Sequence, residues 1–272
     1  MRLWDFKGLE YYWGLLHPLV LIIGFIISGS TSIVVSRMVS VIFGSLSIGV
    51  IFLILARYFD KKTAFAGSVF MIFLPVSAFS DTVGMQEPLG LFFLLLGVYL
   101  LQLKPFLAGV SLMFSGMVRS EYWIFSGILV LVFILRSKID VHHKVMVALG
   151  YFVFVLLYMK YLLDYTGNPI YPVWTAYLAT YKGDWFLPVN LNSMQETIKQ
   201  ISRLVVYGSL LGLLITLWKR PRCFPFFSVG FLNIALIAAM HGFGAYIKGF
   251  ELKVLVDRLL AFPYGFIGTL LS

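Results

Sequence analysis

Long apolar runs separated by short polar connectors dominate the sequence. An α-helix rises 1.5 Å per residue, so about 20 residues cross the roughly 30 Å of membrane hydrocarbon. Unpaired backbone groups cannot face lipid, and the runs are too long for barrel strands, so each run is predicted to be a helix. The pattern therefore predicts an all-α, polytopic transmembrane helix bundle with about nine crossings. The runs cover 33–57, 63–79, 88–103, 105–118, 122–135, 145–163, 201–218, 223–240 and 254–272.

The charged residues divide between alternate connectors. Four connectors are short and basic, and among the acidic residues they hold only Asp60 and Asp140. By the positive-inside rule these basic connectors are cytoplasmic. The alternate connectors hold most of the other acids and are predicted to share the non-cytoplasmic face. The basic connectors are 57–62, Lys104, 136–144 and 219–222, and the alternate ones are 80–87, 119–121, 164–200 and 241–253.

The composition places the chain among integral membrane proteins. Hydrophobic residues make up 60% of the 272 residues and charged residues only 12%, and the mean hydropathy is +0.93, outside the range of soluble domains. The net charge of +9 resides largely in the basic connectors, so it sets topology and predicts no nucleic-acid partner. The single cysteine, Cys223, excludes an internal disulfide and favours a packed thiol. We expect one transmembrane domain over 1–272, with 164–200 as its large outer loop.

The first apolar segment, 15–28, allows two interpretations from its residues alone. It is long enough to approach a crossing, but His17 and Pro18 interrupt it early, and aromatic residues crowd the sequence before it. Such an arrangement is also typical of a helix at the membrane surface. The segment could therefore cross the membrane or lie along its outer face.

Several charged residues fall at predicted outer helix ends, where charge is costly unless it is paired or used. Glu87 directly precedes Pro88, so it could stabilise a helix N-terminus, or act as a base or metal ligand. Arg119 could pair with Glu121 or with lipid head groups, or it could hold a phosphate with its planar guanidinium. Arg258 lies beside Asp257 in the last helix and could be an ion-paired or snorkelling charge. His241 and Lys248 precede it in a Gly-rich loop that could fold over a ligand.

The connector 164–200 is rich in Tyr, Trp, Asn and Pro. Such residues form interfacial aromatic belts, and they also bind sugars by ring stacking and hydrogen bonding. The candidates for acceptor or sugar binding are Asn168, Tyr171 and Trp174 in this connector, together with His241.

Taken in order, four segments resemble the polytopic C-type glycosyltransferases, which include the dolichyl-phosphate-mannose-dependent protein mannosyltransferases and the aminoarabinose transferases. The first segment is 36–101, a helix, a basic turn, an exit helix and an acidic outer loop. The others are AGVSLMFSGMVRSEYW (108–123), TGNPIYP (166–172), which is similar to a segment of many prokaryotic members, and DRLLAFPYGF (257–266).

The resemblance implies a hexosyltransferase in the cell membrane, of prokaryotic type, that moves a sugar from a polyprenyl-phosphate donor to a lipid, glycan or protein acceptor on the outer face. Arg119 and Arg258, with Lys248, would hold the donor phosphate, and Glu87 would position the acceptor or a metal. Membrane lipid is the other expected partner. The resemblance allows a divalent cation, Mg²⁺ or Mn²⁺, and the residues identify no ligand set for it.

One departure from the family pattern concerns the start of the chain. The family carries an additional first helix followed by an acidic outer loop, and this chain resembles the family only after that point. We therefore expect 1–32 to be an outer juxtamembrane segment in which 15–28 forms an amphipathic surface or re-entrant helix. Asp5 or Glu10 would replace the family's acidic residue and serve as general base. A shortened or inactive transferase-like scaffold, and a small-molecule transporter with charges near the bilayer midplane, are the alternative functions.

Overall fold

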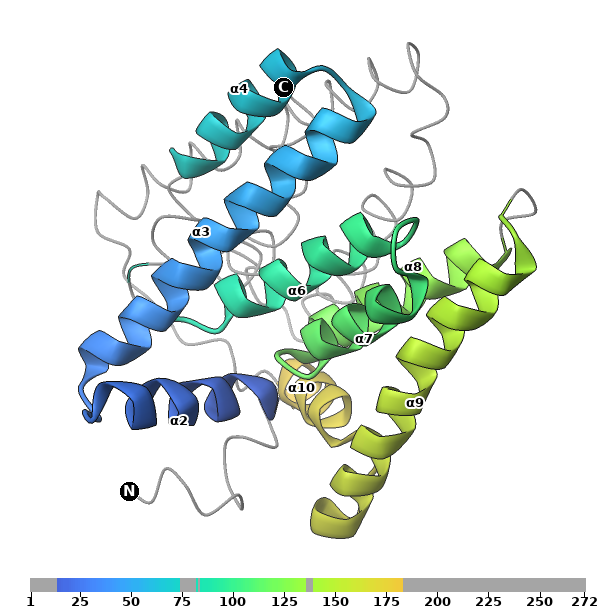
Figure 1. Cartoon of the computed structure of the whole chain (residues 1–272). Helices are drawn as coiled ribbons and strands as arrows, with labels where there is room; N and C mark the ends of the chain where they lie inside the picture. The colour runs from blue at the N-terminus through green and yellow to red at the C-terminus, as the bar shows by residue number, and fades with distance from the viewer. Residues whose placement is uncertain (1–13, 74–81, 83, 136–138, 183–272) are drawn as a thin grey trace. The chain divides into compact units, whose positions relative to one another are not determined.

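The computed structural model describes residues 14–73, 82, 84–135 and 139–182, and these residues form helices and connecting turns without a strand. The predicted all-α class is therefore confirmed for this part of the chain (Figure 1). The helices are α2 (Leu16–Ser28), α3 (Ile33–Tyr58), α4 (Lys61–Ile72), α6 (Glu87–Leu100), α7 (Pro105–Gly116), α8 (Ser120–Leu135), α9 (Val141–Thr166) and α10 (Tyr171–Lys182).

Helix boundaries follow the local sequence signals. Pro88 and Pro105 lie in the first turns of α6 and α7, where a missing N–H costs nothing. Gly167 ends α9 with a left-handed φ of 71°, which glycine adopts without steric cost. The Asp60 carboxylate accepts a hydrogen bond from the Thr63 N–H at 2.7 Å and caps α4. This hydrogen bond from Thr63 lowers the pKa of Asp60, as expected when the charged form is bonded.

Two of these helices are long and apolar enough to cross a membrane. Each of α3 and α9 has 26 residues and so extends about 39 Å. The helices α6, α7 and α8 form in the predicted runs but have 14, 12 and 16 residues. Within the described ranges, the bundle of about nine crossings is therefore not confirmed. The runs predicted at 201–218, 223–240 and 254–272 lie outside the described residues.

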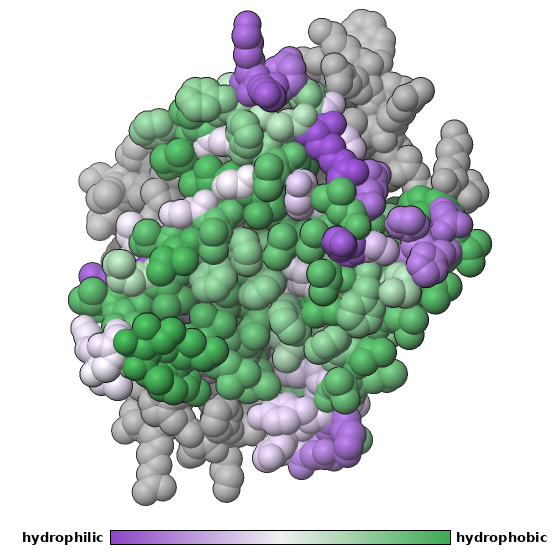
Figure 2. Space-filling model, viewed as in Figure 1, coloured by the Kyte–Doolittle hydropathy of each residue, from purple (hydrophilic) through white to green (hydrophobic). Residues whose placement is uncertain are grey.

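The long helices expose much of their apolar surface. Only 44% of the most apolar window of α3 and 33% of that of α9 are buried, whereas the core helix of a soluble protein is mostly buried. Exposed apolar side chains follow α9 at Val145, Leu149, Phe152 and Leu156. On the face of the molecule drawn in Figure 2, hydrophobic residues cover most of the surface of the described part of the chain. Apolar surface of this kind marks a site of contact with a membrane or with another protein.

The chain divides into two compact units. Unit 1 comprises residues 1–50 and 80–177, and unit 2 comprises residues 51–79 and 178–272. In the described residues, unit 1 holds α2, the first part of α3, α6 to α9 and most of α10. The prediction of one transmembrane domain over 1–272 stays a prediction.

Helices α6, α7, α8 and α9 form the core of unit 1. Helices α7 and α9 pack closely at Gly109 and Gly150, where a side chain would meet the backbone of the other helix: a Cβ on Gly150 would lie 2.1 Å from the Phe106 carbonyl oxygen. Small residues at crossings are typical of helices that pack within membranes. A chain of edge-on phenylalanine rings also runs through this unit, with Phe93 and Phe114 at 5.5 Å and Phe114 and Phe154 at 5.5 Å.

Helix α2 runs across one end of unit 1. At its start, the Leu16 N–H donates to the Met117 carbonyl at 3.0 Å, in the turn between α7 and α8. At its other end the chain passes into α3, whose first turns contact Gly84 and Met85 just before α6. The Glu87–Arg119 ion pair joins this start of α6 to the α7–α8 turn. Both ends of α2 therefore lie at the same end of unit 1, which we call the Glu87 end.

The surface of α2 differs from the expected amphipathic pattern. The helix forms over Leu16–Ser28, close to the predicted 15–28, but Ile23, Ile26 and Ile27 are exposed. Gly24 faces the other way, against Val39 of α3, where an added Cβ would meet the valine side chain at 3.1 Å. The exposed side of α2 is therefore apolar as well, and such a surface suits hydrocarbon better than water.

Candidate functional site

The candidate site begins with Glu87, the first residue of α6. Pro88 follows it in the first helical turn and favours helix initiation there. A carboxylate in the first turn is stabilised by the unpaired N–H groups of the helix start. The Glu87 side chain is only 18% exposed, so it is largely shielded from solvent. This partial burial makes the choice of its partner energetically important.

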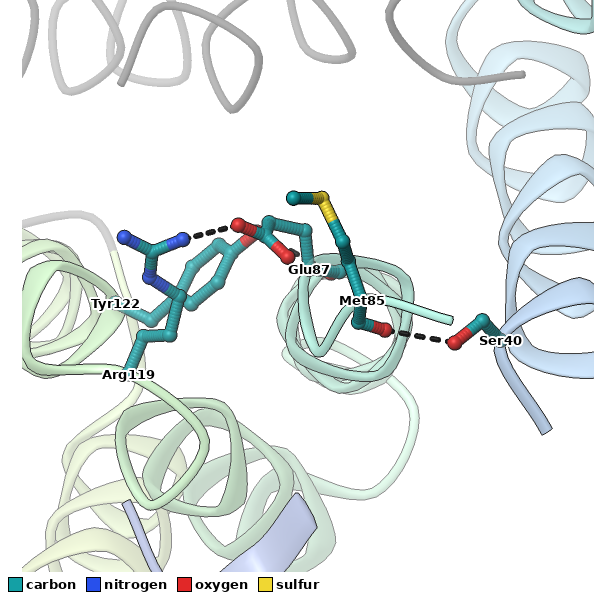
Figure 3. A network of polar contacts seen from close by, with 5 residues as sticks. All are labelled: Ser40, Met85, Glu87, Arg119 and Tyr122. Atoms are coloured by element: carbon teal, nitrogen blue, oxygen red, sulfur yellow. Dashed lines mark hydrogen bonds and ion pairs between the residues drawn. The ribbon is translucent and has the colours of Figure 1, made fainter. Parts of the chain in front are cut away.

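Arg119 is that partner. It lies in the turn between α7 and α8, and its Nη1 donates to the Glu87 Oε1 although the two residues are 32 positions apart. Figure 3 shows the guanidinium and the carboxylate turned toward each other. The Arg119 side chain is 12% exposed. The sequence allows a pair between Arg119 and Glu121, and the structure shows Arg119 paired with Glu87 of α6.

Tyr122 supports Glu87 from α8. Its hydroxyl donates to the Glu87 backbone carbonyl at 3.3 Å, and its side chain is buried. Gly90 provides the space for the ring, because a Cβ at that position would lie 2.5 Å from the Tyr122 Cε2 atom. Sequence reasoning did not select Tyr122 as a site residue. The available signal was its place one helical turn beyond Arg119 in the RSEYW segment.

Two serines of α3 also reach the site. The Ser40 hydroxyl donates to the Met85 carbonyl at 2.7 Å, as drawn in Figure 3, and the Ser36 hydroxyl donates to the Gly84 carbonyl at 3.3 Å. Gly84 has a left-handed φ of 85°, a conformation that few other residues adopt easily. Sequence reasoning missed these serines. Their one signal is the spacing of four residues, which places both hydroxyls on one face of an apolar helix.

The structure brings two of the charged candidates together. Glu87 and Arg119 form an ion pair, whereas the roles expected of them, acceptor or metal positioning and phosphate binding, stay predictions. Glu121 lies in the first turn of α8. The other predicted site residues lie outside the described residues, and their places in the site stay predictions: Asp5, Glu10, His241, Lys248 and Arg258.

The predicted sugar-binding residues of the connector 164–200 have local roles in the structure. Asn168 forms a turn after α9, in which its Oδ1 accepts from the Ile170 N–H at 3.0 Å. Tyr171 begins α10, a helix that the sequence analysis did not predict within this connector. Trp174 is exposed on α10. Asn168 therefore stabilises the turn between the two helices, and sugar binding by these residues stays a prediction.

The described residues offer no assembled metal site. Among residues 14–73, 82, 84–135 and 139–182, no three His, Cys, Asp or Glu side chains group as metal ligands.

The Glu87–Arg119 pair combines a group that can bind anions with a group that can accept protons. The guanidinium is permanently charged and its planar donors match carboxylates and phosphates. The carboxylate can accept a proton or a hydroxyl hydrogen bond. While the two groups neutralise each other, little net charge is held in this shielded position. An anionic ligand would compete with Glu87 for Arg119 and release the carboxylate for a second partner.

The comparisons with known proteins found no matching family model, no matching curated protein and no matching solved structure. The family resemblance read from the sequence therefore stays a prediction.

Proposed function

We propose that this protein is a polytopic membrane glycosyltransferase. It would transfer a sugar from a polyprenyl-phosphate donor to a lipid, glycan or protein acceptor on the non-cytoplasmic face. The observation that carries the proposal is the Glu87–Arg119 pair, a shielded anion-binding group beside a proton-accepting group at one end of a set of apolar helices. The order of the four family-like segments supports the same assignment.

The donor's chemistry explains why such a site belongs at a membrane edge. The isoprenoid tail of the donor is held in hydrocarbon, so the phosphate lies where apolar helices meet polar loops. Exposed apolar surface along α3 and α9 supports the membrane location. Helix α2, whose ends both lie at the Glu87 end of unit 1, would rest in the outer leaflet as a surface or re-entrant helix.

Each site residue has a proposed role. Arg119 would bind the donor phosphate and stabilise the charge that develops as the phosphate leaves. Arg258 and Lys248 would add to this phosphate site. Glu87 would position the acceptor hydroxyl or a metal ion, and Asp5 or Glu10 would act as general base.

Topology gives a direct test of the proposed sidedness. Single cysteines at Thr82, Asn192 and Gly249, each in a Cys223→Ser background, are expected to react with a membrane-impermeant maleimide applied to intact cells. A cysteine at Lys62 is the control and should react only after the membrane is opened. Labelling of any of the first three solely from the cytoplasm would overturn the scheme.

The proposed activity is tested with the purified full-length chain in liposomes. Short-chain polyprenyl-phosphate mannose and polyprenyl-phosphate aminoarabinose, each labelled in the sugar, serve as donors, with a membrane extract as acceptor source. The expected result is protein-dependent release of polyprenyl phosphate with transfer of the label to acceptor. Binding of polyprenyl phosphate without transfer would indicate an inactive scaffold. Uptake of a solute with both donors left intact would indicate a transporter.

A further inference from the structure

The two serines of α3 that contact the site differ from Ser47 on the same helix and from Ser68 on α4. They resemble Ser111 of α7, which donates outside its helix to the Phe93 carbonyl of α6 at 2.7 Å. Ser47 on the same helix donates to its own helix, at the Phe43 carbonyl and 2.8 Å. Ser68 on α4 does the same with the Ala64 carbonyl at 2.8 Å. A hydroxyl in an apolar helix is commonly satisfied in this way, by the carbonyl four residues earlier. Ser36 and Ser40 instead donate outside their helix.

Both of their acceptors belong to the turn that leads into α6. Ser40 is almost fully buried, 2% exposed, and its bond to the Met85 carbonyl is short, 2.7 Å. Ser36 contacts the Gly84 carbonyl. A Cβ on Gly84 would lie 3.1 Å from the Ser36 Oγ and 3.3 Å from the Arg37 backbone nitrogen, so α3 and this turn are tightly packed.

This turn fixes the position of the Glu87 backbone, from which the side chain extends toward Arg119. Met85 lies two residues before Glu87, so its carbonyl direction sets how the backbone enters α6. Tyr122 holds the Glu87 carbonyl from the other side at 3.3 Å. Figure 3 shows Ser40 and Tyr122 on opposite sides of the segment that carries Glu87. A functional carboxylate must be held to within about 0.5 Å of its working geometry, which such supporting bonds provide.

We propose that Ser40, assisted by Ser36, is a positioning residue that holds Glu87 against Arg119. The first turns of α3 thereby form part of the site, although they contribute no group that contacts the reacting atoms. The catalytic consequence of this positioning rests on the proposed function, whereas its effect on the Glu87–Arg119 pair does not.

A double-mutant cycle measures the positioning without any substrate. The coupling between Glu87 and Arg119 is obtained from the unfolding free energies of Glu87→Gln, Arg119→Gln and the double variant in detergent micelles. The cycle is repeated in a Ser40→Ala and in a Ser47→Ala background. Ser47 is the matched control because it lies on the same helix, is also 2% exposed and bonds within its helix.

The expected result is that Ser40→Ala lowers the coupling by about half or more, while Ser47→Ala leaves it unchanged. Ser36→Ala should lower the coupling less, because its hydrogen bond is longer. If Ser40→Ala does not fold, Ser36→Ala supplies the same comparison against Ser47→Ala. A Ser40→Ala protein that loses stability but keeps the full coupling would show that Ser40 only anchors α3, and the proposal would be wrong.

The transfer reaction separates this proposal from the proposed function. With an active enzyme, Ser40→Ala should lower kcat about tenfold or more and leave the donor KM nearly unchanged, since Glu87 is displaced and Arg119 is not. Loss of coupling in a protein that transfers no sugar would retain Ser40 as the positioning residue and refute the transferase. An equal loss of kcat in Ser40→Ala and Ser47→Ala would overturn the positioning role.

Discussion

Arg119→Ala is expected to lower the free energy of unfolding by about 1–3 kcal/mol, because the shielded Glu87 carboxylate loses its cation. This loss of stability is smaller than that expected for a fully buried ion pair, because the Arg119 and Glu87 side chains are 12% and 18% exposed. In an active enzyme the same change should reduce kcat/KM about tenfold or more, the loss of one charge-assisted phosphate contact. Denaturation in detergent and the donor-release assay measure the two effects.

Two further variants control this prediction. Lys160→Ala removes another ion pair, with Asp164 at 3.0 Å, whose side chains are 73% and 52% exposed, and it should change stability by no more than about 0.5 kcal/mol. Adding Glu87→Gln to Arg119→Ala should recover part of the lost stability, since no uncompensated charge is left. Equal effects of Arg119→Ala and Lys160→Ala would contradict the importance of the pair.

Gly150→Ala is expected to destabilise the protein by about 2–3 kcal/mol or more, since close packing offers no room for an added methyl group. The new Cβ would lie 2.1 Å from the Phe106 carbonyl oxygen, and on Gly109 it would lie 2.3 Å from the Val147 carbonyl oxygen. Both contacts are with backbone, which cannot rotate away, so α7 and α9 would have to separate. Thermal unfolding in detergent, followed by circular dichroism, measures the loss.

Gly49→Ala is the matched control for this second prediction. Gly49 lies within the helix α3, and a Cβ there meets nothing within 4 Å. Alanine is the better helix former by about 1 kcal/mol, so this variant should be neutral or slightly stabilised. If Gly150→Ala lowers the stability and Gly49→Ala raises it, the close packing of α7 against α9 causes the loss, and not the removal of a glycine as such. A Gly150→Ala protein as stable as Gly49→Ala would disprove the close contact.

The selection of Glu87 and Arg119 was possible from the sequence because each is a charge at the end of an apolar run. Such a charge must be paired or used, whatever the fold. Ser40 and Gly90 gave no comparable signal, since a serine or a glycine in an apolar helix is ordinary. Their roles arise only from what lies beside them, the Met85 carbonyl and the Tyr122 ring.

The sequence alone determined the helical class, the positions of the helices from 16 to 166 and the separation of basic connectors from acidic ones. These features depend on hydropathy, length and local capping, which act over one or two helical turns. Tertiary structure decided that Arg119 pairs with Glu87, that α2 crosses the Glu87 end of unit 1 with an apolar exposed side, and that Gly109 and Gly150 bring two backbones together. Those outcomes depend on which helix faces meet in space, and hydropathy is the same for every pairing of equally apolar faces.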